Sequence, residues 1–268
     1  MAGKKSKGNW TIVLVIIIGF ALYKTLFDDA GPGKQQVPHS PVSVARMLPP
    51  STYGTNGVRN DWPNMTEGAV SDAEDKLAKN YYVILDDSGS MKSDICATGH
   101  ASRLSAAIEA LAAFAEGMPP QANIGVMTFD GGNFTELLPL GKRSSKEIRD
   151  LSRRVVASGK TPLATAITRG YEALRTQGAS QVGYGEYHLV VITDGEASDG
   201  EYPDTIIDRI LAESPVDIHT IGFCIGQEHV LNQPDTLSYQ PADNVQSLRQ
   251  GLQDVLAEAP AFTVSSFK

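Results

Sequence analysis

Basic residues are in the minority in this chain of 268 residues, where 31 Asp and Glu side chains outnumber 23 Lys and Arg side chains and leave a formal net charge of −8. Because a concentrated basic face is needed to bind a nucleic-acid backbone, this balance argues against a nucleic-acid partner. Cysteine is nearly absent, with only Cys96 and Cys224. The one long apolar run lies within the first 27 residues, which sets that segment apart from the rest.

Residues 1–27 have the composition of an N-terminal membrane anchor. Three lysines, at positions 4, 5 and 7, precede the uncharged segment Gly8–Tyr23. A spanning helix needs about 20 apolar residues, and this length is reached if Lys24 extends its amine to the interface and Leu26 and Phe27 are counted. No convincing small-x-small cleavage site follows, so an uncleaved anchor is favoured, with a cleaved signal peptide as the alternative.

The lysines also predict the orientation of this anchor. Positive charges stay on the cytoplasmic side, so we expect a single-pass membrane protein with a cytoplasmic N-terminus and a periplasmic or extracellular domain. The lack of an obvious eukaryotic signal architecture favours a bacterial inner membrane.

A linker and a tail flank the folded domain. Residues 28–79 are rich in Pro and Gly and contain no apolar run long enough to build a core. Within them, Tyr53, Trp62 and Met65 are candidates to pack on the domain, and the capping-box spacing of Ser71 and Glu74 predicts a short helix over Ser71–Ala78. Residues 80–258 form the domain, and residues 259–268 form a C-terminal tail.

Strands and helices alternate from Asn80 onward, which is typical of an α/β fold with a doubly wound, mostly parallel sheet. Phe134–Leu140 is expected to return antiparallel at the sheet edge after a glycine-rich turn. The predicted strands are 81–85, 122–129, 134–140, 187–193, 216–223 and 237–240, and the predicted helices are 103–116, 145–156, 163–175, 205–212 and 245–256.

Polar side chains follow the first and fourth predicted strands at the points where these strands end. The apolar run Tyr81–Leu85 stops at Asp86, and Ser88 and Ser90 follow at alternate positions. Thr161 precedes the Pro-Leu pair that opens a helix, and Asp194 ends the strand 187–193. Ligands bind outside the carboxyl ends of parallel strands, so these oxygen-bearing side chains predict a site for a hard cation.

The pattern Asp86-x-Ser88-x-Ser90, followed by Thr161 and by Asp194, resembles the metal-ion-dependent adhesion site of the von Willebrand factor type A domain family. The resemblance covers roughly residues 80–258. It implies a bound Mg²⁺, or another divalent cation such as Mn²⁺ or Ca²⁺, with Ser88, Ser90 and Thr161 in direct contact. In the family, the equivalents of Asp86 and Asp194 usually act through water or by holding the serines.

Hydroxyl ligands leave the charge of a bound cation largely uncancelled, and Mg²⁺ keeps water at its remaining positions. We therefore expect the site to capture an acidic side chain of a protein partner and not to break bonds. Enzyme interpretations also fail on particular residues. A haloacid-dehalogenase-type phosphatase would need a second carboxylate at Ser88, and a phosphate-binding P-loop ending at Thr161 would need glycine at Arg154.

Other side chains near the predicted site have simpler explanations. Asp87, Glu196, Asp199 and Glu201 are expected to form a solvated acidic rim, with a second cation site as the alternative. His100 is expected to be a solvated loop residue. His188 and His219 are expected to be strand residues without a functional role.

The two cysteines are predicted to form a disulfide. Cys96 and Cys224 are the only cysteines, the domain is expected in an oxidising compartment, and both residues lie beyond the carboxyl ends of strands. Two separate buried thiols remain the alternative, since the two strands are not expected to be neighbours.

The sequence as a whole predicts a membrane-anchored, extracytoplasmic binding module that engages a protein through a divalent cation. The alternative is an accessory or assembly subunit of a membrane or envelope complex, in which the metal is mainly structural. A metal-dependent hydrolase is a third class, but no nucleophile and base are found within reach of the ion.

Overall fold

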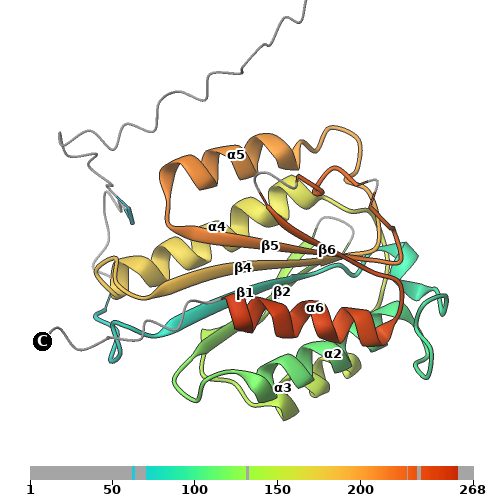
Figure 1. Ribbon diagram of the computed structural model, residues 1–268, viewed down its shortest axis with the longest axis horizontal. Helices are drawn as coiled ribbons and strands as arrows, with labels where there is room; N and C mark the ends of the chain where they lie inside the picture. Colours follow the sequence, from blue (N-terminus) through green and yellow to red (C-terminus); the bar gives the residue numbers. More distant parts are fainter. Residues whose placement is uncertain (1–61, 64–70, 131–132, 228, 234–236, 259–268) are drawn as a thin grey trace, which may run out of the picture. The chain divides into compact units, whose positions relative to one another are not determined.

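The computed structural model describes residues 62–63, 71–130, 133–227, 229–233 and 237–258 (Figure 1). The predicted anchor 1–27, most of the linker 28–79 and the tail 259–268 lie outside the described residues. Among the residues that are described, no helix is long and apolar enough to cross a membrane.

Six strands of the described chain form one sheet in the order β3-β2-β1-β4-β5-β6. All neighbouring pairs are parallel except β2 and β3, which are antiparallel, so the expected edge hairpin is confirmed. The strands are β1 (Lys79–Leu85), β2 (Asn123–Asp130), β3 (Asn133–Gly141), β4 (Glu186–Thr193), β5 (Val216–Phe223) and β6 (Ser238–Ala242).

Helices cover both faces of the sheet, as the prediction of a doubly wound fold requires (Figure 1). One face carries α2 (Arg103–Gly117), α3 (Ser145–Asp150) and α6 (Val245–Glu258), and the other carries α4 (Leu163–Ser180) and α5 (Pro203–Glu213). Two short 3₁₀ helices, η1 (Gly89–Lys92) and η2 (Leu151–Arg153), lie in the connections.

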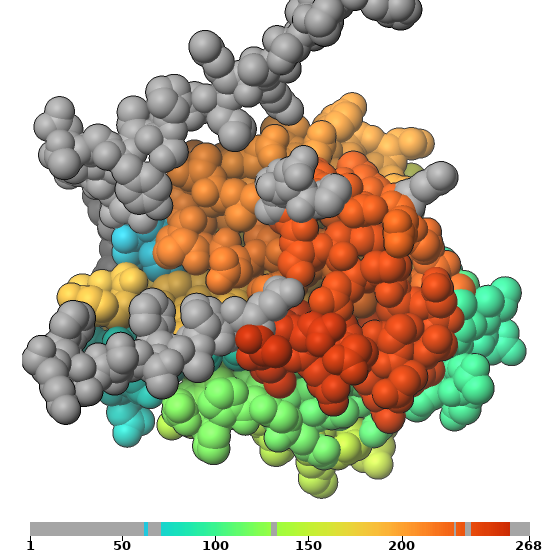
Figure 2. Space-filling model, viewed as in Figure 1, coloured from blue at the N-terminus to red at the C-terminus, as the bar shows by residue number. Residues whose placement is uncertain are grey.

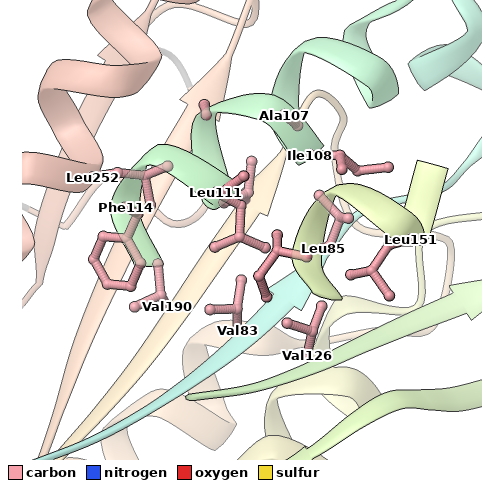
Figure 3. Packing of buried hydrophobic residues seen from close by; sticks show 14 of the residues in the cluster. Val83, Leu85, Ala107, Ile108, Leu111, Phe114, Val126, Leu151, Val190 and Leu252 are labelled. Carbon is pink, nitrogen blue, oxygen red and sulfur yellow. The ribbon is translucent and has the colours of Figure 1, made fainter. Parts of the chain in front are cut away.

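Strand β1 lies in the middle of the sheet and is buried on both faces. Val83 and Leu85 join the apolar cluster of α2 and α6, where Leu111 and Leu252 pack beside them (Figure 3). Ile84 joins the cluster of α4 and α5 on the other face. Because neither face of β1 meets water from Tyr81 to Leu85, this part of the strand is continuously apolar and does not alternate with polar residues.

Helix α4 packs unusually close to the sheet at Gly170. A Cβ atom at this position would lie 2.6 Å from Leu189 Cδ1 and 3.2 Å from Ile84 Cδ1, so a larger residue requires the helix or the strands to shift. This close contact fixes α4, and with it the loop before α4, relative to β1 and β4.

The predicted helix Ser71–Ala78 is wrong, since this segment forms bends and turns. Its backbone groups bond elsewhere, because the Gln181 side chain donates to the carbonyls of Asp75, Lys76 and Ala78 and Ala73 donates to the carbonyl of Ser180. A helix would use these groups internally, so contacts with the end of α4 override the local capping signal.

The predicted helix Ser145–Val156 is shorter than expected. Its start is correct, because Ser144 and Glu147 form a reciprocal capping box, but α3 ends at Asp150 and η2 follows. The chain must leave the helix here to carry Ser158 to the carbonyl of Asp87, 2.6 Å away.

Trp62, from the predicted linker, packs on the domain as suggested by the sequence. Its ring meets Tyr187 edge-on with a centroid distance of 4.5 Å, and it covers Gly178 of α4, where a side chain would collide with it. The absence of a side chain at Gly178 therefore makes room for an aromatic residue that lies 17 positions before β1.

Two histidines of neighbouring strands are buried side by side on the face of the sheet that α2 and α6 cover. His188 Nδ1 and His219 Nε2 are 3.3 Å apart, and the ring of His188 stacks on Tyr81. Glu186 and Asp217 are the nearest carboxylates, at 3.6 and 3.8 Å from His188 nitrogens. Burial lowers the pKa of His188 to about 4, and the neighbouring His219 contributes to the shift.

Acid is expected to destabilise the domain through His188. Its folded-state pKa of about 4 lies below the ordinary value of 6.5, so the unfolded chain binds the proton more tightly and folding stability falls as the pH falls from about 6.5 to about 4. Thermal unfolding at about pH 7.5 and pH 5 measures this loss. Replacement by His188→Phe, which keeps a ring beside Tyr81 and cannot be protonated, should make the decrease in Tm smaller. An equal decrease in the variant and the parent would contradict this role of His188.

Candidate metal-binding site

Three loops meet at the carboxyl end of the sheet, at the right of Figure 1. Asp86 follows β1, Asp194 follows β4, and Thr161 lies two residues before α4. Backbone hydrogen bonds join the loops, because Asp86 N donates to Ile192 O at 2.9 Å and Gly89 N donates to Gly159 O at 3.2 Å. The structure therefore brings all five predicted metal ligands to one end of the fold.

The carboxylate of Asp86 is fully buried at the base of this site. It accepts a hydrogen bond from the backbone N–H of Ser88 at 2.7 Å and another from the Thr193 hydroxyl at 2.6 Å. Burial raises the pKa of Asp86, whereas these hydrogen bonds lower it. Asp86 thus shapes the turn that carries Ser88 and ties the end of β1 to the end of β4.

The two serines and Asp194 form a chain of hydrogen bonds. Ser90 Oγ donates its only proton to Asp194 Oδ1 at 2.6 Å, so the 3.0 Å contact between Ser88 Oγ and Ser90 Oγ has Ser88 as the donor. Both hydroxyl protons then point along this series of hydrogen bonds toward Asp194. The oxygens of both hydroxyls keep lone pairs that can make a further contact. Ser88 and Asp194 are buried, whereas Ser90 is exposed to solvent.

Thr161 enters the same space from the loop before α4. A Cβ atom built at Gly195 would lie 3.7 Å from Ser90 Oγ and 3.8 Å from Thr161 Oγ1, so both hydroxyls face the small volume above Gly195. Thr161 is held there by Ser198, because Thr161 N donates to Ser198 Oγ at 2.8 Å and Ser198 N donates to Thr161 O at 2.9 Å.

These residues fit a hard divalent cation. Three neutral hydroxyls and two carboxylates offer only oxygen, which is the ligand that Mg²⁺ and Ca²⁺ prefer. The Ser90 and Thr161 hydroxyls both lie within 4 Å of a Cβ atom built at Gly195, so they face the same point. Within the described ranges, no group of three or more His, Cys, Asp or Glu side chains could hold a metal ion, so this set depends on its serines and threonine.

Arg103 is a site residue that the sequence analysis did not find. Its Nη1 lies 2.7 Å from Asp194 Oδ2, its Nε donates to Ile95 O at 3.0 Å, and its side chain is nearly buried. Arg103 is the first residue of α2, where the helix dipole disfavours a cation. A basic residue at that position was the available signal that an anion lies nearby.

The predicted disulfide between Cys96 and Cys224 is confirmed. The bond joins the loop after β1 to the end of β5, with a Cα–Cα distance of 6.1 Å and a sequence separation of 128. Arg103 Nη2 contacts Cys224 Sγ at 3.2 Å. The guanidinium therefore bridges the disulfide and the Asp194 carboxylate.

The predicted solvated acidic rim is only partly correct. Glu196 and Asp199 are exposed, but Asp87 is buried and accepts a hydrogen bond from Phe129 N at 3.0 Å. Glu201 accepts from the backbone N–H and the hydroxyl of Thr165, both at 2.8 Å, and so satisfies the first turn of α4. The remaining exposed carboxylates do not gather into a second cation site.

His229 also supports the site and was not predicted. Its Nε2 donates to Gly195 O at 2.9 Å and its Nδ1 accepts from Leu231 N at 3.1 Å, which fixes the tautomer and positions the loop after Asp194. A single histidine in a loop more than thirty residues from its partner gave no sequence signal. His100 donates through its backbone to Ala97 and lies in the loop that Cys96 anchors.

Comparison with protein families identifies the part of the chain that carries this geometry. Residues 81–196 match the family model for the von Willebrand factor type A domain. All five predicted metal ligands lie within the matched residues. A comparison with curated protein sequences found no match.

Solved structures of the same fold come from distant proteins. Proximal thread matrix protein 1 from the mussel byssus is 18% identical, with a TM-score of 0.52 and coverage of 67% of this chain and 47% of that chain. An aerotolerance-related membrane protein from Bacteroides fragilis is 17% identical, with a TM-score of 0.52 and coverage of 66% and 98%. A von Willebrand factor type A protein from Catenulispora acidiphila is also 17% identical, with a TM-score of 0.52 and coverage of 67% and 42%. This chain therefore spans about half the length of the mussel protein.

Proposed function

We propose that the von Willebrand factor type A domain of this chain is a binding module that holds a divalent cation, most simply Mg²⁺, and engages a protein partner through an acidic side chain. The observation that carries the proposal is the hydrogen-bond chain from Ser88 through Ser90 to Asp194, with the Thr161 hydroxyl facing the same space.

The side chains of this site are suited to bind such an ion weakly enough that the ion can still take a further oxygen ligand. Ser88, Ser90 and Thr161 would be direct ligands, and Asp86 and Asp194 would orient the hydroxyls and supply negative charge. When bound, the cation supplies an open position for an oxygen ligand. A carboxylate of a partner binds there in a partly desolvated setting, where the attraction exceeds its value in water.

Arg103 adjusts the charge of the site. With Asp86 and Asp194 ionised and Arg103 protonated, these three groups carry one net negative charge, so the site loaded with a divalent cation carries one net positive charge. Without Arg103, the two carboxylates carry two negative charges and the loaded site is neutral. The Arg103 guanidinium, 2.7 Å from Asp194, therefore lowers the affinity of the site for a metal ion and raises the affinity of the loaded site for an anionic partner.

The function proposed is binding, in which the donor set would hold the ion and a carboxylate of the partner would complete its coordination. We further propose that residues 1–27 anchor the chain in a membrane as a single span, with the domain outside the cytoplasm. The lysines before the apolar run and the disulfide between the only two cysteines support this topology.

The variant Ser88→Ala is expected to lose Mg²⁺ affinity by roughly 10-fold or more while the domain stays folded, because it removes one proposed ligand without adding charge. Calorimetric titration of the purified full-length chain with Mg²⁺ measures the affinity, and circular dichroism checks the fold. Ser152→Ala, in η2 and away from the site, is the matched control and should bind as the parent does. Mg²⁺ binding by Ser88→Ala equal to that of the parent would sink the proposed function of this site.

The variant Arg103→Gln is expected to change two affinities in opposite directions. Mg²⁺ should bind roughly tenfold more tightly, as expected for loss of one neighbouring charge, and acetate should bind the Mg²⁺-loaded domain more weakly. Calorimetry measures the first affinity and NMR titration with acetate the second, with thiol counting to check the disulfide. Arg103→Lys, which keeps the charge, should resemble the parent. Both affinities changing in the same direction would exclude this charge effect.

The proposed topology predicts protease sensitivity from one side of the membrane. Protease added to intact spheroplasts that express the chain should digest the domain, because everything after residue 27 lies outside the cytoplasm. Immunoblotting against the domain measures its loss, with a cytoplasmic protein as the control. A domain that survives until the membrane is permeabilised means that the orientation is reversed.

A further inference from the structure

The disulfide between Cys96 and Cys224 is connected to the candidate metal site through Arg103. The guanidinium of Arg103 contacts three different groups with its three nitrogens. Nη1 binds Asp194, Nε donates to the carbonyl of Ile95, and Nη2 contacts the sulfur of Cys224. Because Ile95 is the neighbour of Cys96, two of these three contacts belong to the segments that the disulfide joins.

The disulfide also fixes the loop after β1 relative to the end of β5. Among the described residues, the hydrogen bonds of residues 94–100 stay within this loop or reach Ser93 and Arg103. Arg103 N in turn donates to Ser93 O at 2.7 Å. The covalent bond to Cys224 therefore holds the carbonyl of Ile95 in place beside the end of β5, where the third contact of Arg103 lies.

Both cysteines have a backbone conformation that L residues rarely adopt. The φ angle is 68° at Cys96 and 66° at Cys224, and among the described residues other than glycine only Val182 shares this left-handed region. Such a conformation persists only where the surrounding structure enforces it. Because both ends of one covalent bond show it, we attribute it to the bond, and cleavage of the bond allows both segments to relax.

The position of the disulfide leaves it open to a reductant. Both cysteines are only partly buried, and Asp94, Ile95 and Thr98 beside Cys96 are exposed. In Figure 2 the loop after β1, in teal, projects from the surface of the domain. Thiol–disulfide exchange requires a sulfur that an attacking thiolate can approach, and the partial burial of this bond meets that requirement in the folded domain.

We propose that this disulfide is a redox switch that sets the charge of the candidate metal site through Arg103. The inference rests on the proposed function, because it concerns the regulation of that same site. In the oxidised protein the joined segments hold Arg103 on Asp194, so the site binds metal more weakly and the loaded site binds an anionic partner more tightly. Reduction frees Arg103 from Asp194, so the metal is bound more tightly and the partner is released.

The switching step is a thiol–disulfide exchange with a protein dithiol as the reductant. A thiolate of the reductant attacks one sulfur and forms a mixed disulfide, while the S–S bond breaks and the other sulfur leaves as a thiolate that takes up a proton. The second thiol of the reductant then attacks the mixed disulfide. Cys96 and Cys224 gain two electrons and two protons and become thiols, and the reductant becomes a disulfide.

The test compares three forms of the purified full-length chain by calorimetric titration with Mg²⁺. These are the oxidised chain, the chain reduced with dithiothreitol and desalted under nitrogen, and the double variant Cys96→Ser with Cys224→Ser. Thiol counting checks the redox state and circular dichroism checks the fold. The reduced chain and the double variant should bind Mg²⁺ about three- to tenfold more tightly than the oxidised chain, up to the effect of one neighbouring charge. NMR titration should show weaker acetate binding to their Mg²⁺-loaded forms.

The variant Arg103→Gln tests whether the guanidinium carries the effect. Reduction of this variant should change its Mg²⁺ affinity by less than about twofold, because the charge that reduction would release from Asp194 is already absent. Arg149→Gln is the matched control, since the Arg149 guanidinium pairs with Glu109 and Glu116 and not with the site. Reduction should change the Mg²⁺ affinity of Arg149→Gln as it does in the parent.

Thiol counting supplies a second measurement of the same coupling. If reduction tightens Mg²⁺ binding, Mg²⁺ must favour the reduced form by the same factor. In buffers of reduced and oxidised dithiothreitol, saturating Mg²⁺ should therefore shift the midpoint of reduction by the same three- to tenfold toward the dithiol. Sodium chloride at equal ionic strength controls for salt.

The outcomes separate the switch from the proposed function. Equal Mg²⁺ affinities of the oxidised and reduced chains would overturn the switch and leave the metal-binding function standing. Weaker Mg²⁺ binding by the reduced chain, or a response of Arg103→Gln equal to that of the parent, would mean that the disulfide braces the site without setting its charge, which also overturns the switch. If neither redox form binds Mg²⁺, both proposals fail.

Discussion

The site depends on the burial of one carboxylate. Asp86 lies at the end of a strand that is covered on both faces, where an ionised group without partners costs several kcal/mol. Its two oxygens are satisfied by the backbone of Ser88, in the loop after β1, and by the hydroxyl of Thr193, the last residue of β4. Satisfying Asp86 therefore requires β1 and β4 to end in register, and this requirement brings the loops of Ser88 and Asp194 to the same end of the sheet.

Most of the architecture could be predicted from the sequence, and the five candidate ligands could be placed at one end of it, because the signals involved are local. The apolar run before Asp86, the Pro-Leu pair after Thr161 and the Asp-Gly pair after β4 each mark an element and its end within a few residues. The order of elements then places these ends at one edge of a parallel sheet.

The remaining features could not be predicted because they depend on distant partners. Arg103 acts on Asp194, 91 residues later, and His229 acts on Gly195, 34 residues earlier. The predicted helix over Ser71–Ala78 failed for the same reason, since Gln181 takes its carbonyl groups. Local propensity cannot include a hydrogen bond from a side chain more than one hundred residues away.

The central position of β1 has a mechanical consequence. The chain enters the sheet at Lys79, the first residue of β1, and the candidate site begins at Asp86, directly after the last residue of the same strand. A pulling force between the preceding chain and a partner held at the site would therefore run along β1. Its hydrogen bonds to β2 and β4 would be loaded together in shear, and not broken one after another as when a strand is peeled from a sheet edge.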